Sequence, residues 1–132
     1  MSSAEIKANR PLSPHIQIWR WQLTMAMSIV HRVTGIALYA GTLLLAVWLI
    51  AAATGPRPFD AINRVAGSWF GLLVLLGYTW ALIHHMLGGL RHFVWDFGLA
   101  LGTPARDRIA LANLVASVVL TIAIWAIGLA LR

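Results

Sequence analysis

Three long apolar stretches without Asp, Glu, Lys or Arg dominate the sequence. They cover residues 33–53, 65–90 and 109–131, and are 21, 26 and 23 residues long. A hydrocarbon layer of about 30 Å is crossed by roughly 20 helical residues, and lipid offers no partner to backbone polar groups outside a helix. The pattern therefore predicts an all-α membrane protein with three transmembrane helices in a bundle.

Residues that favour turns separate these stretches. The segment 54–58 contains two prolines, which cannot donate backbone hydrogen bonds, and Gly55, which suits a helix C-cap. We expect it to end the first helix and to be followed by a short external loop, while residues 97–104 end the second helix. The expected spans are 24–53, 65–96 and 108–131.

The N-terminal segment 1–23 mixes prolines and tryptophans with charged residues and has no apolar core of the kind that signal peptides require. We expect this segment to be retained at the membrane interface, because the indole ring favours the headgroup layer. No internal repeat or second domain is evident, so residues 1–132 are expected to form a single membrane-anchor domain.

Composition narrows the functional class. Hydrophobic residues make up 60% of the chain and charged residues only 11%, so the net charge of +6 is interpreted as a topology signal and not as a nucleic-acid surface. Basic residues gather before the first span and between the second and third. The positive-inside rule then predicts a cytoplasmic N-terminus. Cysteine is absent, which excludes a thiolate-bound iron-sulphur cluster in this chain.

The first helix has an unusually polar face. Ser28 and Arg32 lie one turn apart, and Gly35 follows one turn deeper. An arginine inside a membrane costs on the order of 2 to 3 kcal/mol on insertion scales, so it needs a partner, a cavity or a route to the interface. One interpretation is that Arg32 snorkels to the headgroups. The other is that Ser28 and Arg32 donate hydrogen bonds to one small acceptor, such as a quinone carbonyl.

The second helix carries two adjacent histidines on different faces. His85 shares its face with Gly89 and His92, whereas His84 and Arg91 point about 100° away. A neutral imidazole at this depth suits an axial haem ligand, and small neighbours let a flat macrocycle approach the helix. The alternative is a pair of histidines that hydrogen-bond between packed helices.

No histidine of another helix in this chain matches the depth of His85. If a haem is held by two axial histidines, the second must therefore come from another subunit. On the third helix Asn113, Ser117 and Thr121 recur every four residues, which favours a helix-packing stripe over a binding site.

The order of these motifs resembles the cytochrome b subunit family of succinate dehydrogenase. The resemblance rests on residues 13–20 (SPHIQIWR), 28–35 (SIVHRVTG) and 85–92 (HMLGGLRH), and it covers nearly the whole chain. It implies one of the two membrane anchors of respiratory complex II, bundled with a second anchor and bound to an iron-sulphur subunit and a flavoprotein subunit. The expected location is a bacterial inner membrane.

The resemblance also implies roles for individual residues. His85 corresponds to the axial ligand of haem b, and the second anchor would supply the opposite histidine. Ser28 and Arg32 correspond to the ubiquinone-binding pair. His31 and Arg32 lie where family members approach the haem propionates. Gly89 and His92 complete the predicted haem environment, and no catalytic residue is expected in this chain.

Two other functions remain open from the sequence. A fumarate reductase anchor would share the architecture and use menaquinol. A haem-free membrane assembly or transport protein would use Arg32 and His85 to line a proton or solute path.

Overall fold

The computed structural model describes residues 20–131, which form four helices and no strand. Three helices are long and apolar enough to cross a membrane: α2 (Leu23–Thr54), α4 (Trp69–Asp96) and α5 (Thr103–Ala130). A shorter helix, α3 (Pro56–Ala66), joins α2 to α4. The predicted all-α membrane fold with three spanning helices is confirmed.

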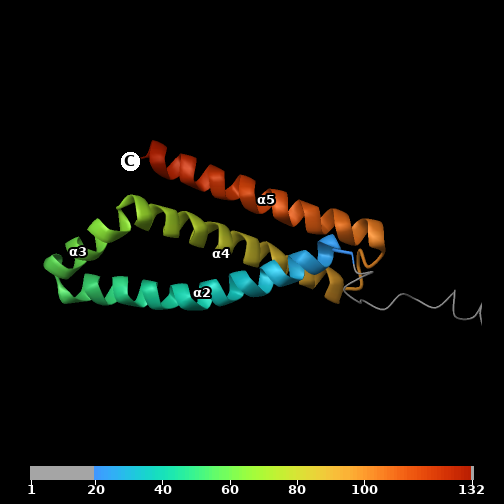
Figure 1. Cartoon of the computed structure of the whole chain (residues 1–132), viewed down its shortest axis with the longest axis horizontal. Coiled ribbons are helices and arrows are strands. Elements are labelled where there is room, and N and C mark those ends of the chain that lie inside the picture. Colours follow the sequence, from blue (N-terminus) through green and yellow to red (C-terminus); the bar gives the residue numbers. More distant parts are fainter. Residues whose placement is uncertain (1–19, 132) are drawn as a thin grey trace, which may run out of the picture.

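The three long helices alternate in direction, with α4 between α2 and α5 (Figure 1). The start of α2 and the connection from α4 to α5 lie at one end of the bundle. Helix α3 and the last turns of α5 lie at the other end. Helix α4 therefore packs against both of its neighbours, and its two histidines face different ones.

Small and polar side chains make up much of the core of the described part. The buried apolar residues are Met27, Ala51, Ala81, Ile83 and Ala110. The buried polar residues are Thr34, His84, Arg91, Asn113, Ser117 and Thr121. Most large aliphatic side chains of the three long helices are exposed instead. This distribution suits helices that pack closely through small residues and turn their bulky side chains to lipid or to neighbouring chains.

The connection from α2 to α4 was expected to be a loop, and this prediction is wrong. Gly55, with φ 136°, ends α2 and directly precedes α3. The left-handed region of φ suits glycine because it has no Cβ. The prolines that end α2 also begin α3, since the fixed φ of proline fits the first turn of a helix.

Two helix starts also differ from the expected ones. Helix α4 begins at Trp69 and not at residue 65, because Ser68 caps it: the Ser68 hydroxyl accepts a hydrogen bond of 3.1 Å from the Gly71 amide. Helix α5 begins at Thr103, five residues before the expected 108, again with a proline in its first turn. Most of the expected interfacial segment, residues 1–19 with His15 and Trp19, lies outside the described residues, as does residue 132.

Candidate functional site

Two histidines from α2 and α4 stack against each other near the end of the bundle where α2 begins. The imidazole rings of His31 and His85 have centroids 4.0 Å apart and an interplanar angle of 5°. His92, two turns after His85, is exposed, and its ring centroid lies 5.5 Å from that of His31. Three histidines that the sequence predicts to share one site are therefore brought together. The expectation that no histidine of another helix lies at the depth of His85 is wrong, because α2 and α4 cross so that His31 stacks directly on His85.

The hydrogen bonds of His85 define which ring nitrogen carries the proton. His85 Nδ1 lies 3.0 Å from the backbone carbonyl oxygen of His31, and a carbonyl can only accept. The Thr34 hydroxyl lies 3.4 Å from the same nitrogen, and it already donates to the carbonyls of Val30 and His31 at 2.9 Å. Both contacts fit an Nδ1–H donor. In the neutral ring this leaves Nε2 with its lone pair unprotonated, which is the form that binds a metal.

Glycines create the space around this pair. A Cβ on Gly35 would lie 2.9 Å from His85 Cε1, so glycine there lets the imidazole pack against α2. Gly88 does the same for His31, whose ring occupies the place where a side chain on residue 88 would begin. Gly89 differs from both, because a Cβ there would meet nothing within 4 Å apart from its chain neighbours and the backbone of its own helix. The surface beside His85 is therefore open.

His84 faces the opposite neighbour and is sealed. It is 0% exposed, and its Nδ1 lies 3.3 Å from Ser117 Oγ and 3.4 Å from the Asn113 side-chain nitrogen on α5. Its Nε2 is fully buried and has no hydrogen-bond partner among residues 20–131. A macrocycle could reach that nitrogen only if the residues that bury it moved away. The polar stripe on α5, with Asn113, Ser117 and Thr121 all buried, packs between helices as predicted.

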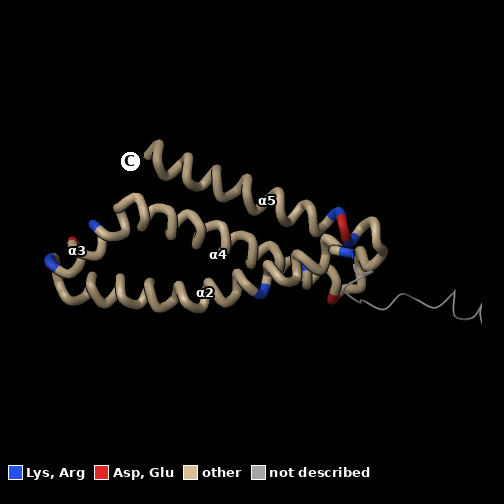
Figure 2. The backbone as a smooth tube through the Cα atoms, in the orientation of Figure 1, with Lys and Arg blue, Asp and Glu red and all other residues tan. Residues whose placement is uncertain are grey.

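Ser28 and Arg32 lie on an exposed face of α2, one turn apart. Within the described part of the chain, neither side chain makes a hydrogen bond or an ion pair. Arg32 is nine residues into the helix, which is about 14 Å from its start at 1.5 Å per residue. Figure 2 shows that most charged residues lie at the ends of the bundle. The two donors are therefore free to serve a group from outside this chain.

Arg91 is buried, unlike an arginine that is solvated at the membrane interface. It is 3% exposed, and its guanidinium carbon lies 5.1 Å from the centroid of the Trp95 ring. Its Nε and Nη1 atoms find no hydrogen-bond partner in residues 20–131. Asp96 is exposed and makes no ion pair with Arg91 in the described structure.

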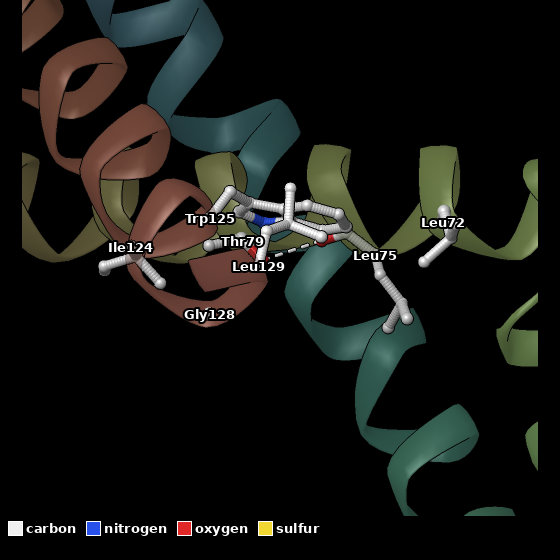
Figure 3. Close-up of a pocket in the computed structure, with 7 residues that line it drawn as sticks. All are labelled: Leu72, Leu75, Thr79, Ile124, Trp125, Gly128 and Leu129. Carbon is white, nitrogen blue, oxygen red and sulfur yellow. Dashed lines mark hydrogen bonds between the residues drawn. The ribbon is translucent and has the colours of Figure 1, made fainter. Parts of the chain in front are cut away.

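A hollow lies between α4 and α5, towards the end of the bundle where α5 finishes (Figure 3). Its volume is about 370 Å³, and a hydrogen bond of 3.3 Å from Trp125 Nε1 to Thr79 Oγ1 crosses it. The other lining residues are Leu72, Leu75, Ile124, Gly128 and Leu129. This lining contains no ionisable group, in contrast to the histidine pair.

Comparison with known proteins identifies the family of the chain. A family model described as the succinate dehydrogenase/fumarate reductase transmembrane subunit matches residues 6–124. The chain belongs to this family. The match includes α2 and α4, so it covers every residue of the candidate site.

Individual relatives within the family are similar over most of their length. The succinate dehydrogenase cytochrome b556 subunit of Paracoccus denitrificans is 43% identical over 116 residues, covering 88% of this chain and 89% of the relative. The mitochondrial cytochrome b560 subunit of Sus scrofa is 37% identical, with coverages of 90% and 72%. The cytochrome b556 subunit of Rickettsia felis is 33% identical, with coverages of 92% and 94%. The predicted resemblance is confirmed.

Two residues of the site were not predicted. Thr34 is buried beside His85, and Gly88, not Gly89, accommodates His31. A signal for Thr34 was present in the sequence, because the buried positions Met27, Thr34 and Gly41 of α2 recur every seven residues. That spacing marks a helix face that packs closely against a neighbour.

Proposed function

We propose that this chain is a membrane anchor of a succinate dehydrogenase complex that holds haem b together with a second anchor subunit and forms part of the ubiquinone-reducing site. The observation that carries the proposal is the hydrogen bond from His85 Nδ1 to a backbone carbonyl, which leaves Nε2 of this half-buried side chain unprotonated. The family match supports the membrane-anchor part of the proposal.

The residues around His85 suit a haem. His85 would be the axial ligand from this chain, with Gly89 leaving room for the flat ring and His92 at its edge. His31 and Arg32 would lie near the propionates. Bound haem b would supply a one-electron carrier within the membrane. Among the described histidines, only His31 lies against the His85 ring, and it stacks parallel to that ring at 4.0 Å, which leaves no room for a macrocycle between the two. The other axial ligand would therefore come from the second anchor subunit.

Ser28 and Arg32 would hold the quinone. The Ser28 hydroxyl and the Arg32 guanidinium, one turn apart and without partners in the described chain, can both donate to a quinone oxygen. A charged donor is worth most where negative charge develops on that oxygen during reduction. Water from the cytoplasmic side would supply the protons.

The orientation follows from the charges. Arg20, Arg91, Arg106 and Arg108 lie towards the end of the bundle where α2 begins. By the positive-inside rule this end faces the cytoplasm of a bacterial inner membrane. The iron-sulphur subunit would bind there, close to Ser28 and Arg32, and would connect this chain to the flavoprotein subunit that oxidises succinate.

The haem assignment is tested by replacing His84 and His85 one at a time. We expect His85→Ala to remove the b-type absorbance of the purified complex, because it removes the ligand. His84→Ala should retain this absorbance, because the His84 side chain points between α4 and α5. The measurement is a dithionite-reduced minus oxidised spectrum, with subunit ratios as the assembly control. The reverse pattern would overturn the assignment.

The quinone assignment is tested by Ser28→Ala and Arg32→Leu. Both side chains are exposed and unpaired in the described chain, so neither change should disturb folding. We expect ubiquinone reduction to fall while succinate oxidation with an artificial acceptor at the flavoprotein is retained. Equal losses in both assays would indicate an assembly defect and contradict a quinone role.

The family description also covers fumarate reductases, whose anchors would use menaquinol. The relatives described above are all named as subunits of succinate dehydrogenase, which favours that direction. Rates measured in both directions with ubiquinone and menaquinone analogues would distinguish the two enzymes.

A further inference from the structure

Helix α3 is strongly amphipathic and is fixed against α2. Phe59 and Ile62 are partly buried on the side that faces α2. The Trp48 indole of α2 donates a hydrogen bond of 3.1 Å to the Asn63 side-chain oxygen, and its ring centroid lies 5.5 Å from that of Phe59. The short helix is therefore held in a defined place at the end of the bundle opposite the histidine pair (Figure 1).

An apolar groove of about 480 Å³ runs between α2 and α3. Its lining residues are Val47, Ile50, Ala51, Thr54, Pro58, Ala61, Ile62 and Val65. The α2 part of this lining runs over eight residues, from Val47 to Thr54, or about 10 Å of helix length. Thr54 is the one hydroxyl in it, and that hydroxyl already donates to the Ile50 carbonyl at 2.6 Å.

The chemistry of this lining restricts what can occupy the groove. The backbone groups of both walls lie within helices, and the Thr54 hydroxyl is used, so the groove offers little to hydrogen-bond an occupant. A peptide would bury unpaired amide groups, each at a cost of roughly 1 to 3 kcal/mol. A hydrocarbon chain has no such groups. The groove therefore favours an acyl chain over an extended peptide. A helix would pair its own amides, but it would not use the two exposed arginines beside the groove, Arg57 and Arg64, which favour a phospholipid.

Two arginines mark one rim of the groove. At 100° per residue, Arg57, Ala61 and Arg64 fall on one line along α3, and Ala61 belongs to the groove lining. Both guanidinium groups are exposed, and neither forms an ion pair with Asp60 or with any other described residue. Figure 2 shows these positive residues of α3 at the outer end of the bundle.

We propose that the α2–α3 groove and its arginine rim form a binding site for an anionic phospholipid. One acyl chain lies in the groove, and Arg57 and Arg64 bind the phosphate of the headgroup. A guanidinium matches the geometry of phosphate oxygens and can donate two parallel hydrogen bonds to them. The site lies at the end of the bundle away from His85, and it does not depend on the haem or quinone assignments.

The site is tested on the whole purified complex after its lipids have been exchanged for detergent. Dioleoyl-phosphatidylglycerol and dioleoyl-phosphatidylcholine, which share their acyl chains, are added separately while the melting temperature and retained lipid are measured. We expect tighter binding and a larger rise in melting temperature with phosphatidylglycerol. sn-Glycerol 3-phosphate, which lacks the acyl chains, should have no effect.

Variants separate the two halves of the site. One basic residue near an anionic surface typically contributes about 1 kcal/mol, so Arg57→Gln with Arg64→Gln should weaken phosphatidylglycerol binding about 30-fold. Arg108→Gln, an exposed arginine at the opposite end, is the matched control and should have no effect. Ala61→Phe should block the groove and reduce binding of both lipids.

Three results would overturn the proposal. They are equal stabilisation of the unaltered complex by both lipids, a phosphatidylglycerol preference that survives in the double arginine variant, and stabilisation by sn-glycerol 3-phosphate equal to that by the lipid. If Ala61→Phe prevents assembly, the two arginine substitutions still decide the matter, because their side chains are exposed and make no ion pairs in the described structure.

Discussion

Replacing Gly89 by alanine tests whether a flat group lies against this part of α4. In the described chain a Cβ on Gly89 meets no atom within 4 Å, and the same is true of Gly77 in the same helix. Alanine is about 1 kcal/mol more favourable than glycine inside a helix. Each substitution should therefore leave the fold of this chain intact or slightly more stable.

The two variants should differ once haem is bound. If the macrocycle lies against Gly89, the added methyl group takes space that the ring needs. Overfilling a packed contact costs about 1 to 3 kcal/mol, which weakens haem binding by about 5- to 150-fold. Gly77 lies twelve residues away, about 18 Å along the helix, so Gly77→Ala should leave haem affinity unchanged.

The assay is the rate at which the purified complexes lose haem to an excess of a haem-scavenging protein, followed by absorbance. Subunit ratios and melting temperature before transfer confirm that both variants assemble. Faster loss from Gly89→Ala alone supports the proposed position of the haem. Equal rates in both variants would refute the reasoning, because they would mean that nothing occupies the open space beside Gly89.

Two further predictions concern stability, measured as the free energy of unfolding or the melting temperature of the complex. Ser68→Ala removes the cap of α4 and should lower the stability by about 1 kcal/mol. Ser68→Asp can still accept a hydrogen bond from the Gly71 amide, so it should lower the stability less. Equal effects of the two substitutions would contradict the capping role. Gly41→Ala would bring a Cβ to 2.6 Å from Cζ and 2.7 Å from Cδ2 of the Tyr78 ring and should destabilise the complex by about 1 to 3 kcal/mol. Tyr78→Leu should relieve part of that cost, and a neutral Gly41→Ala would show that α2 and α4 do not pack there.

The spanning helices could be predicted from the sequence because lipid imposes a length and an absence of charge that a linear pattern records directly. Helix α3 could not be predicted by the same rule. It is too short to span, and the prolines at 56 and 58 were interpreted only as the end of α2. Proline in a first turn begins a helix as well as ending the previous one. The early start of α5 has the same cause at Pro104.

The candidate site was only partly predictable. Helical periodicity correctly separates the faces of His84 and His85, but it cannot say which face meets α2 and which meets α5. That depends on the order of the helices in the bundle. The structure shows His84 sealed against Ser117 and His85 bonded to the His31 carbonyl. A bond to a backbone atom leaves no mark in the side-chain pattern, so periodicity could not reveal it.

The acceptor that orients His85 belongs to the main chain of α2, and this has an evolutionary consequence. Every residue at position 31 presents a backbone carbonyl oxygen, so as long as α2 keeps its path, sequence drift there can alter the stacked ring without removing the acceptor of the His85 Nδ1–H. The tautomer of His85, with hydrogen on Nδ1, thus depends on the path of a neighbouring helix and not on the side chain at position 31. A change in how α2 and α4 cross would remove this hydrogen bond.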